Sequence, residues 1–376
     1  MEYVAVFFAC CVWFYAAFIS RNAWFFARQG CPPATPPRPR PLVTVVVPAR
    51  NEAEHVAQCL TAILAQDYPR DLLEVILVND HSTDATREIA LVRALKDHRL
   101  RVLDLPEEVS QAHKKAALTL GIEAAQGEII LQTDADCVMG PHWVSRMVDH
   151  FGADTALVSG PVRLRAQPHW LEEIQALESM GLVAIGAGSL AAGAPNMANG
   201  ANMAYRREAF LAVDGFAGTE SVASGDDELL LQKIARLKGR KLRFAKCRDA
   251  IVETRALSDW GRLKAQRLRW VSKARAYLNR RVNVVQVIAY LAFLAYPVVL
   301  GLAIWNPAYW LLLAELLVLK WVSDLLLMYQ AAKFFHTFPL LKRLPLLELL
   351  YTPYVLWVGL AGNLVKHYSW KGRTVS

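Results

Sequence analysis

Apolar residues occur in this chain as long runs near both ends and as short runs in the middle. Residues 3–19 contain no charged side chain, and further long apolar segments lie at 284–305, 309–329 and 346–365. A helix of about 17 to 25 apolar residues can cross a membrane. We therefore expect a transmembrane anchor at residues 1–21 and a C-terminal membrane region at residues 284–376 with two to three spans.

Ionisable residues interrupt the last two of these segments: Glu315, Lys320, Asp324 and Glu348. Such residues inside a span are functional candidates by default. Lys320 and Asp324, however, are four positions apart and can pair on one face of a helix. The sequence therefore favours a structural role for this pair.

Basic residues predict how the chain is oriented in the membrane. Arg21 and Arg28 follow the first apolar run, whereas a cleaved signal peptide would have its positive charge before the run. Basic flanks remain on the cytoplasmic side. We expect a multi-pass protein of the cytoplasmic (inner) membrane, with its main domain facing the cytoplasm; the side of the C-terminus stays open.

The middle of the chain has the pattern of an α/β domain. A proline- and arginine-rich linker is expected at residues 22–41, which include CPPATPPRPRP. Within residues 42–257, short apolar runs such as LVTVVVP, LLEVILVND and GEIILQTDAD alternate with helical patterns. This order predicts strand, helix, strand units around a buried, mainly parallel sheet.

A basic segment with interleaved aromatic residues follows at 258–283. Trp260, Trp270 and Tyr277 alternate there with arginines and lysines, which is typical of an amphipathic helix on a membrane surface. Arg267 by itself resembles a surface charge, whereas Arg269 beside Trp270 combines an anion-binding fork with a flat stacking face.

Composition agrees with a membrane protein. Hydrophobic residues make up 54% of the 376 residues, which excludes a disordered or collagen-like chain. The net charge is 42 − 34 = +8, and because the basic residues gather next to apolar runs, membrane lipids are the expected partner and nucleic acid is not. The six cysteines form no CxxC pair, so the sequence indicates neither a disulfide framework nor a zinc site and fits a reducing compartment.

Candidate chemistry lies where predicted strands end. VNDHSTD places Asp80 at the end of the second strand, where ligands of open α/β sheets bind; a helix-capping turn is the alternative interpretation. TDAD places Asp134 and Asp136 two residues apart after the fourth strand. Paired carboxylates suit Mg²⁺ or Mn²⁺ bound through a substrate's phosphates.

A third acidic motif, SGDDE, contains Asp226 and Asp227 at the start of a predicted helix. Acidic residues there interact favourably with the helix dipole, which accounts for Glu228. Two adjacent carboxylates also form a candidate general base.

Taken together, PARNE, VNDHSTD, HKKAAL, TDAD, GDDE and QRLRW resemble, in order and spacing, the motifs of family 2 glycosyltransferases. The chain is most similar to the membrane-integrated branch that contains cellulose, hyaluronan and poly-N-acetylglucosamine synthases and ceramide glucosyltransferases. The resemblance implies a GT-A (Rossmann-like) catalytic domain at 42–257, with transmembrane helices at both ends.

The resemblance also implies roles for individual residues. Asp227, with Asp226 beside it, would be catalytic, and Asp134 and Asp136 would hold the metal. The implied nucleotide-sugar site consists of Ala49, Glu52, Asp80, Lys115, Asp134 and Arg269. The implied acceptor site consists of Gln266 and Trp270.

The expected reaction is inverting, metal-dependent transfer of a hexosyl or N-acetylhexosaminyl group from a nucleotide-diphosphate sugar, UDP-linked by expectation, to a membrane-associated lipid acceptor. The alternative is a processive polysaccharide synthase that extends and exports a glycan. The small number of spans favours the lipid acceptor, because an exported polymer needs a polar tunnel through the hydrocarbon. A non-catalytic receptor for nucleotide sugars would not need both Asp136 and Asp227.

Overall fold

The computed structural model describes residues 1–33, 39–107, 113–219, 225–272, 277, 279–364, 368–370 and 373–375. It divides into two compact units. The helical unit comprises Met1–Arg28, Ala166–Ala192 and Leu257–Lys366, and the sheet unit comprises Gln29–Arg165, Gly193–Ala256 and His367–Ser376. The range 42–257 is thus interrupted by a segment that belongs to the helical unit.

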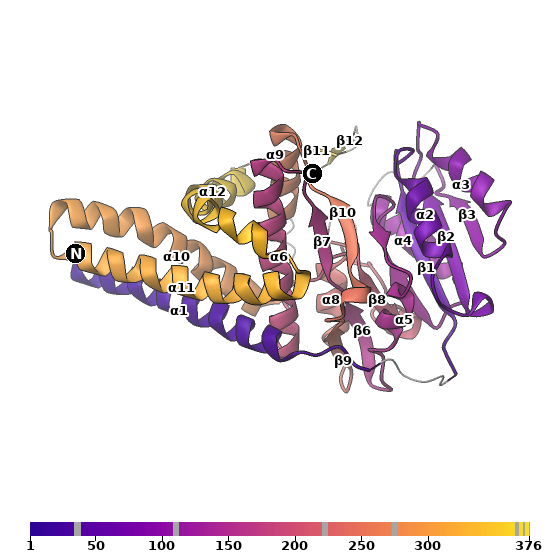
Figure 1. Cartoon of the computed structure of the whole chain (residues 1–376), viewed down its shortest axis with the longest axis horizontal. Coiled ribbons are helices and arrows are strands. Elements are labelled where there is room, and N and C mark those ends of the chain that lie inside the picture. The colour runs from indigo at the N-terminus through magenta and orange to yellow at the C-terminus, as the bar shows by residue number, and fades with distance from the viewer. Residues whose placement is uncertain are drawn as a thin grey trace. The chain divides into compact units, whose positions relative to one another are not determined.

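The sheet unit is built on a seven-stranded sheet of order β3-β2-β1-β4-β8-β6-β9 (Figure 1). Strands β3, β2, β1 and β4 are mutually parallel, as are β6 and β9, whereas β8 is antiparallel to both of its neighbours. The expected mainly parallel α/β sheet is therefore confirmed. Its strands are β1 (Val43–Ala49), β2 (Leu73–Asn79), β3 (Leu100–Asp104), β4 (Ile129–Gln132), β6 (Thr155–Ser159), β8 (Met203–Arg206) and β9 (Lys241–Phe244).

Strands β2, β1 and β4 are almost entirely buried on both faces, as expected for the centre of a sheet with helices on each side. Val45 and Val47 pack into the main core, whereas Val46 faces the other way, toward α4. A β-carbon at Gly121 of α4 would lie 2.5 Å from Val46, so glycine is what allows this helix to approach the sheet. The helices are α2 (Val56–Leu64), α3 (Thr86–Ala94), α4 (His113–Glu123), α5 (Trp143–Val148), α7 (Arg207–Ala212) and α8 (Glu228–Ile234), with short 3₁₀ turns η1 (Arg70–Leu72) and η2 (Arg248–Ala250).

Two smaller sheets complete the unit. One has the order β5-β10-β7 and consists of β5 (Val138–Met139), β10 (Val252–Arg255) and β7 (Val162–Arg165); the other pairs β11 (Tyr368–Trp370) with β12 (Arg373–Val375). A disulfide joins Cys31 to the buried Cys247. The expectation of no disulfide was wrong, because the two cysteines are 216 residues apart and only the fold brings them together.

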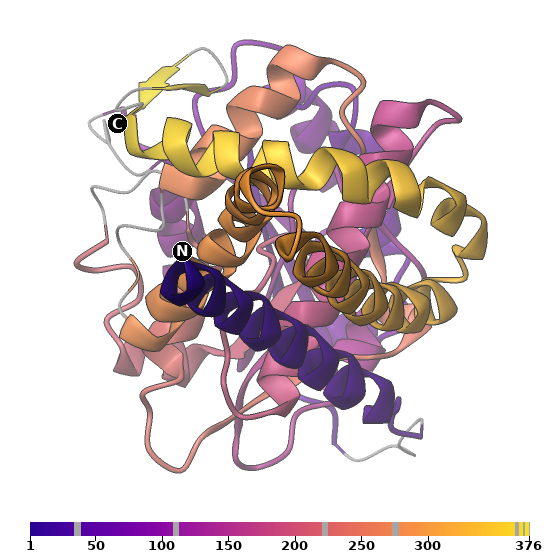
Figure 2. The ribbon, with the colours of Figure 1, turned by 90° about the vertical axis from the view of Figure 1, so that its left-hand side faces the viewer.

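The helical unit contains α1 (Glu2–Arg28), α6 (Trp170–Ala191), α9 (Trp260–Ser272), α10 (Arg280–Trp305), α11 (Tyr309–Phe335), the 3₁₀ segment η4 (Phe338–Arg343) and α12 (Leu344–Leu364). Helices α1, α10 and α11 pack along one another, as Figure 1 shows. Figure 2 shows the unit from another side, with α1 in indigo and α12 in yellow. Positions 273–276 and 278 of the predicted basic helix, and 34–38 of the predicted linker, lie outside the described residues.

Four stretches within the described residues are long and apolar enough to cross a membrane. They are Glu2–Arg28, Trp170–Ala191, Arg280–Trp305 and Phe338–Ala361. Helix α6 was not singled out from the sequence, because its acidic residues Glu172, Glu173 and Glu178 lower its hydropathy. Helix α11 carries more charged residues than these four stretches and is not among the candidate spans, yet it packs against α1 and α10.

The charges of α11 are paired inside the helical unit. The Lys320 ammonium donates to Asp324, 2.8 Å away, and also pairs with Glu348 of α12. The Tyr15 hydroxyl of α1 donates to the other oxygen of Asp324 at 2.8 Å. The predicted pairing of Lys320 with Asp324 is confirmed, and it belongs to a network that joins three helices.

Candidate active site

The loops after β1 and β2 interlock at the carboxyl edge of the sheet. The backbone N–H of Glu52 donates to the Thr86 hydroxyl at 2.7 Å, and the N–H of Thr83 donates to the Asn51 side chain at 2.8 Å. Asn51 and His81 each have a φ of 51°, a left-handed conformation that is uncommon outside glycine. Asn51 and His81 lie in two of the motifs that the sequence singled out, whereas Asp214 and His336, which share this conformation, lie elsewhere.

Asp80 lies between these loops and is almost fully buried. Its backbone N–H donates to the Ala49 carbonyl at 2.8 Å, and its carboxylate contacts His81 Nδ1 at 2.9 Å. The Arg50 guanidinium donates to the Asp80 carbonyl at 2.8 Å and lies 3.9 Å from its carboxylate. Ala49 and Asp80 thus lie at neighbouring strand ends, in the place where the sequence analysis predicted the nucleoside.

A basic residue that the sequence analysis did not name lies at the centre of the acidic motifs. Lys114 of α4 is 2.7 Å from the Asp134 carboxylate and 3.2 Å from that of Asp226. Gln132, at the end of β4, donates to the same Asp226 oxygen at 2.7 Å. The TDAD and GDDE motifs, about ninety residues apart in sequence, are therefore brought together by one ammonium group.

The environment of Lys114 keeps it charged. Burial alone would lower the pKa of its ammonium, but the Asp134 and Asp226 carboxylates outweigh burial and raise that pKa above the ordinary lysine value. The space around it is closely filled, because a β-carbon at Gly200 would lie 2.7 Å from Asp226 Oδ2. Gly200 is thus required for the loop to pass beside this cluster.

Lys115, the lysine named from the resemblance, has different surroundings. It is buried, and its ammonium donates to the Thr219 carbonyl at 2.7 Å. The signal that separates the two lysines was present in the sequence: Lys115 is three and seven positions before the buried Leu118 and Ile122, so it shares their helix face. The nucleotide-binding role of Lys115 stays a prediction.

Asp134 and Asp136 follow the end of β4 at Gln132 and lie in a turn. Both are partly buried, whereas Ala135 between them is fully buried. Asp136 accepts from the Thr254 hydroxyl of β10 at 3.1 Å, and within the described residues no basic side chain pairs with it.

Asp227 caps helix α8. Its Oδ1 accepts from the N–H of Glu228 at 2.7 Å and its Oδ2 from the N–H of Gly200 at 3.2 Å. Asp227 is partly exposed, whereas Asp226 is buried and ion-paired. The two neighbouring acids therefore have different environments: Asp226 belongs to the Lys114 cluster, and Asp227 can be reached from solvent.

The QRLRW residues lie on α9 in the helical unit. Gln266, Arg269 and Trp270 are partly buried there. Arg267 is buried and pairs with Glu178 of α6, so the interpretation of Arg267 as a surface charge was wrong. The buried acid that binds it is 89 residues away in sequence and could not be identified from the local pattern.

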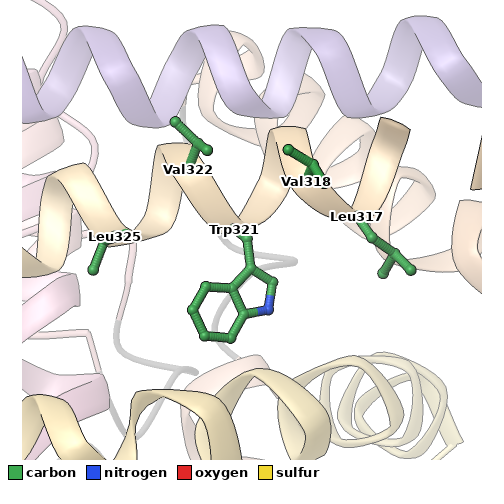
Figure 3. Close-up of a pocket in the computed structure, with 5 residues that line it drawn as sticks. All are labelled: Leu317, Val318, Trp321, Val322 and Leu325. Atoms are coloured by element: carbon green, nitrogen blue, oxygen red, sulfur yellow. The ribbon is translucent and has the colours of Figure 1, made fainter. Parts of the chain in front are cut away.

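A groove of about 340 Å³ on α11 is chemically different from these sites. Five apolar side chains line it: Leu317, Val318, Trp321, Val322 and Leu325 (Figure 3). None of these side chains carries a charge, and the indole N–H of Trp321 is the one hydrogen-bonding group among them. The charged groups suited to such a donor that are described above lie at the edge of the sheet unit.

Comparisons with known proteins show which family the chain resembles. The model of the family "Glycosyl transferase family 2" matches residues 44–213, and that of "Glycosyl transferase family group 2" matches residues 129–356, more than half of the chain. The matched ranges include the Asp80, Asp134 and Asp227 motifs.

The curated relatives match the chain in part, as two of them illustrate. Glycosyltransferase AglE of Haloferax volcanii is 37% identical over 123 residues, which cover 32% of this chain and 40% of that protein. Dolichyl-phosphate beta-glucosyltransferase ALG5C of Trichomonas vaginalis is 36% identical over 99 residues, which cover 25% of this chain and 28% of that protein. The chain thus spans well under half the length of the curated relatives it matches.

The likeness to a solved structure extends over most of the chain. The mannosyltransferase PcManGT from Pyrobaculum calidifontis, solved in complex with GDP-Man and Mn²⁺, superposes with a TM-score of 0.60 at 23% identity, covering 89% of this chain and 98% of that one. This likeness shows a shared fold and confirms the expected GT-A α/β architecture. By the family match over more than half its length, the chain belongs to glycosyl transferase family group 2.

Proposed function

We propose that this protein is an inverting, metal-dependent glycosyltransferase that moves a sugar from a nucleotide-diphosphate sugar to a lipid acceptor in the membrane. The observation that carries the proposal is the cluster of Lys114 with Asp134 and Asp226 beside Asp136, which has no basic partner among the described residues. It lies at the sheet edge where α/β folds bind nucleotides. The family match supports sugar transfer as the chemistry.

The residues present fit a divalent cation. Asp134, whose side chain is 36% exposed, and Asp136 offer the hard oxygen ligands that Mg²⁺ and Mn²⁺ prefer. No group of three or more potential ligands occurs among the described residues, so phosphate oxygens and water would have to complete the coordination of an ion held by Asp134 and Asp136. When bound, the ion would offset the negative charge of the departing nucleoside diphosphate.

The chain's own residues would divide the remaining tasks. Asp80, with Ala49 and Glu52 nearby on the interlocked loops, would bind the nucleoside. Asp227 would accept the proton of the acceptor hydroxyl, because it is held in place by two backbone N–H groups and is still accessible. Asp226 would hold Lys114, and Lys114 would add positive charge beside the diphosphate.

The helical unit supports a lipid acceptor. It contains four stretches long and apolar enough to cross a membrane, and one relative acts, by its name, on dolichyl phosphate, a lipid. We assign Gln266, Arg269 and Trp270 to the acceptor and, from the basic flanks of the apolar runs, the sheet unit to the cytoplasmic side. A UDP-linked sugar donor, which the sequence led us to expect, is part of this proposal.

The test uses purified full-length protein in native lipid with radiolabelled UDP- and GDP-sugars. We expect label in small products that partition into organic solvent, and we expect Asp227→Asn to bind donor while losing transfer by about 10²- to 10⁴-fold. Label in long water-soluble chains would instead support the processive polysaccharide synthase. If Asp226→Asn is inactive and Asp227→Asn is active, the base is Asp226.

A further inference from the structure

Helix α6 holds the start of the QRLRW helix through a two-way hydrogen bond. The side-chain amide of Gln175 donates to the Leu257 carbonyl at 2.7 Å and accepts from the Leu257 N–H at 3.1 Å. Leu257 lies three residues before α9 begins at Trp260. A paired bond of this kind fixes both the position and the direction of the chain as it enters α9.

One turn further along α6, Glu178 binds Arg267 in the middle of α9. Both side chains are buried, and Arg267 is only 4% exposed. Arg267 Nε has no hydrogen-bond partner among the described residues, so the Glu178 contact is the main compensation for its charge. Burying an arginine at such a cost is unusual for a surface helix.

The buried guanidinium has a second contact. Its carbon lies 4.2 Å from the centre of the Trp270 ring, in cation–π geometry. One face of the indole is therefore covered by Arg267. Because Trp270 is partly exposed, only the remaining ring surface is available to a ligand.

We propose that Arg267, held by Glu178, is a positioning residue that fixes the Trp270 indole so that a single face is presented to the acceptor. This inference rests on the proposed function, since it assigns Trp270 to acceptor binding. Sugar rings and acceptor head groups stack on aromatic faces, so the orientation of the indole sets how the acceptor hydroxyl is aimed. Glu178 and Arg267 act through Trp270 and touch neither substrate.

The test compares Glu178→Gln, Arg267→Met and Arg267→Lys with wild type. We expect kcat/KM for the acceptor to fall about 2- to 30-fold in the first two variants, the range that loss of a cation–π contact implies, with the donor KM unchanged. Arg267→Lys keeps the charge but not the planar group, so its kcat/KM for the acceptor should lie between the values of those two variants and that of wild type.

Glu173→Gln is the matched control. Glu173 lies on the same helix and also pairs with a basic residue, Arg343, but that partner is on η4 and not on α9. This variant should leave the acceptor constants unchanged. If the single variants fail to fold, the double variant Glu178→Gln with Arg267→Met removes both charges and leaves none uncompensated.

A spectroscopic measurement separates this inference from the proposed function. The fluorescence of Trp270, taken as the difference between each protein and its Trp270→Phe counterpart, should become more accessible to acrylamide in Arg267→Met. If wild type transfers no sugar, the proposed function fails, and the fluorescence still decides the positioning role. Unchanged Trp270 quenching, or equal loss in donor and acceptor constants, would overturn the inference.

Discussion

At the scale of single residues, the charge balance of the sheet edge depends on Lys114. Two carboxylates share its ammonium, at 2.7 and 3.2 Å. Because the pKa of Lys114 is raised in the folded protein, its contribution to stability is complete below the ordinary lysine pKa of about 10.4 and is lost as pH rises through the folded value. The cluster should therefore stay intact at all physiological pH values.

We expect Lys114→Met to weaken sugar transfer and to strengthen metal binding at the same time. Removing the ammonium takes away positive charge beside the departing diphosphate, but it also relieves repulsion of a cation at Asp134. The repulsion between the ammonium and the metal ion, reduced for screening by solvent, is above about 1 kcal/mol. Its loss predicts roughly tenfold tighter Mn²⁺ binding. Titration followed by Mn²⁺ electron paramagnetic resonance measures this directly.

Lys241→Met is the control for that variant, since Lys241 is exposed and pairs with Asp154 away from the acidic motifs. It should change neither metal affinity nor transfer. Weaker Mn²⁺ binding in Lys114→Met would show that the lysine does not compete with the metal.

Asp136→Asn tests the metal site from the opposite side. The carboxylate of Asp136 has the Thr254 hydroxyl but no basic partner within the described residues, so it has most to gain from a metal ion. We expect the variant to bind Mn²⁺ at least about tenfold more weakly and to lose transfer, with unchanged thermal unfolding. Full activity of Asp136→Asn in the presence of a chelator would rule out the metal assignment.

At the scale of secondary-structure elements, the sequence predicted those strands and helices that depend on a local pattern of apolar and polar residues. Strands β1, β2 and β4 were predictable because each is a short run of buried, mostly apolar residues followed by a polar motif. Helix α6 was not predictable, because three acidic residues lower the hydropathy of an otherwise apolar helix. The arginines that pair with two of these acids, Arg267 and Arg343, lie far away in sequence. The choice between Lys114 and Lys115 likewise depends on helix phase.

The packing of α1 against α6 depends on Gly188. A β-carbon there would lie 2.4 Å from the Asn22 carbonyl oxygen, and backbone cannot move aside as a flexible side chain can. Close helix contacts in membranes rely on such small residues. We expect Gly188→Ala to destabilise the protein by about 1 to 3 kcal/mol, seen as a lower thermal midpoint in detergent.

Gly301→Ala on α10 is the matched control, because nothing lies within 4 Å of a β-carbon at that position. It should be neutral or slightly stabilising, as alanine is the better helix former by about 1 kcal/mol. Equal midpoints for the two variants would contradict the importance of this contact.

At the scale of the whole molecule, the disulfide and the proposed orientation imply different redox environments for the sheet unit. Cys31 and Cys247 are joined in the sheet unit, whereas a unit that faces the cytoplasm is normally in a reducing environment. The other four cysteines, Cys10, Cys11, Cys59 and Cys137, are free. The thiol state of this one pair therefore reports the compartment of the sheet unit.

We expect the purified, air-exposed protein to contain the Cys31–Cys247 bond, and acid-trapped cells to contain both residues as thiols. Alkylation followed by mass spectrometry distinguishes the two states at each cysteine. The bond closes a loop of more than two hundred residues, and its reduction should lower stability by about 2 to 5 kcal/mol, the usual cost of losing a native disulfide. Cys31→Ser should show the same loss and no further response to reductant, whereas Cys10→Ser should respond like wild type. A disulfide in acid-trapped cells would argue against the cytoplasmic orientation, because a bond that persists there requires an oxidising environment around the sheet unit.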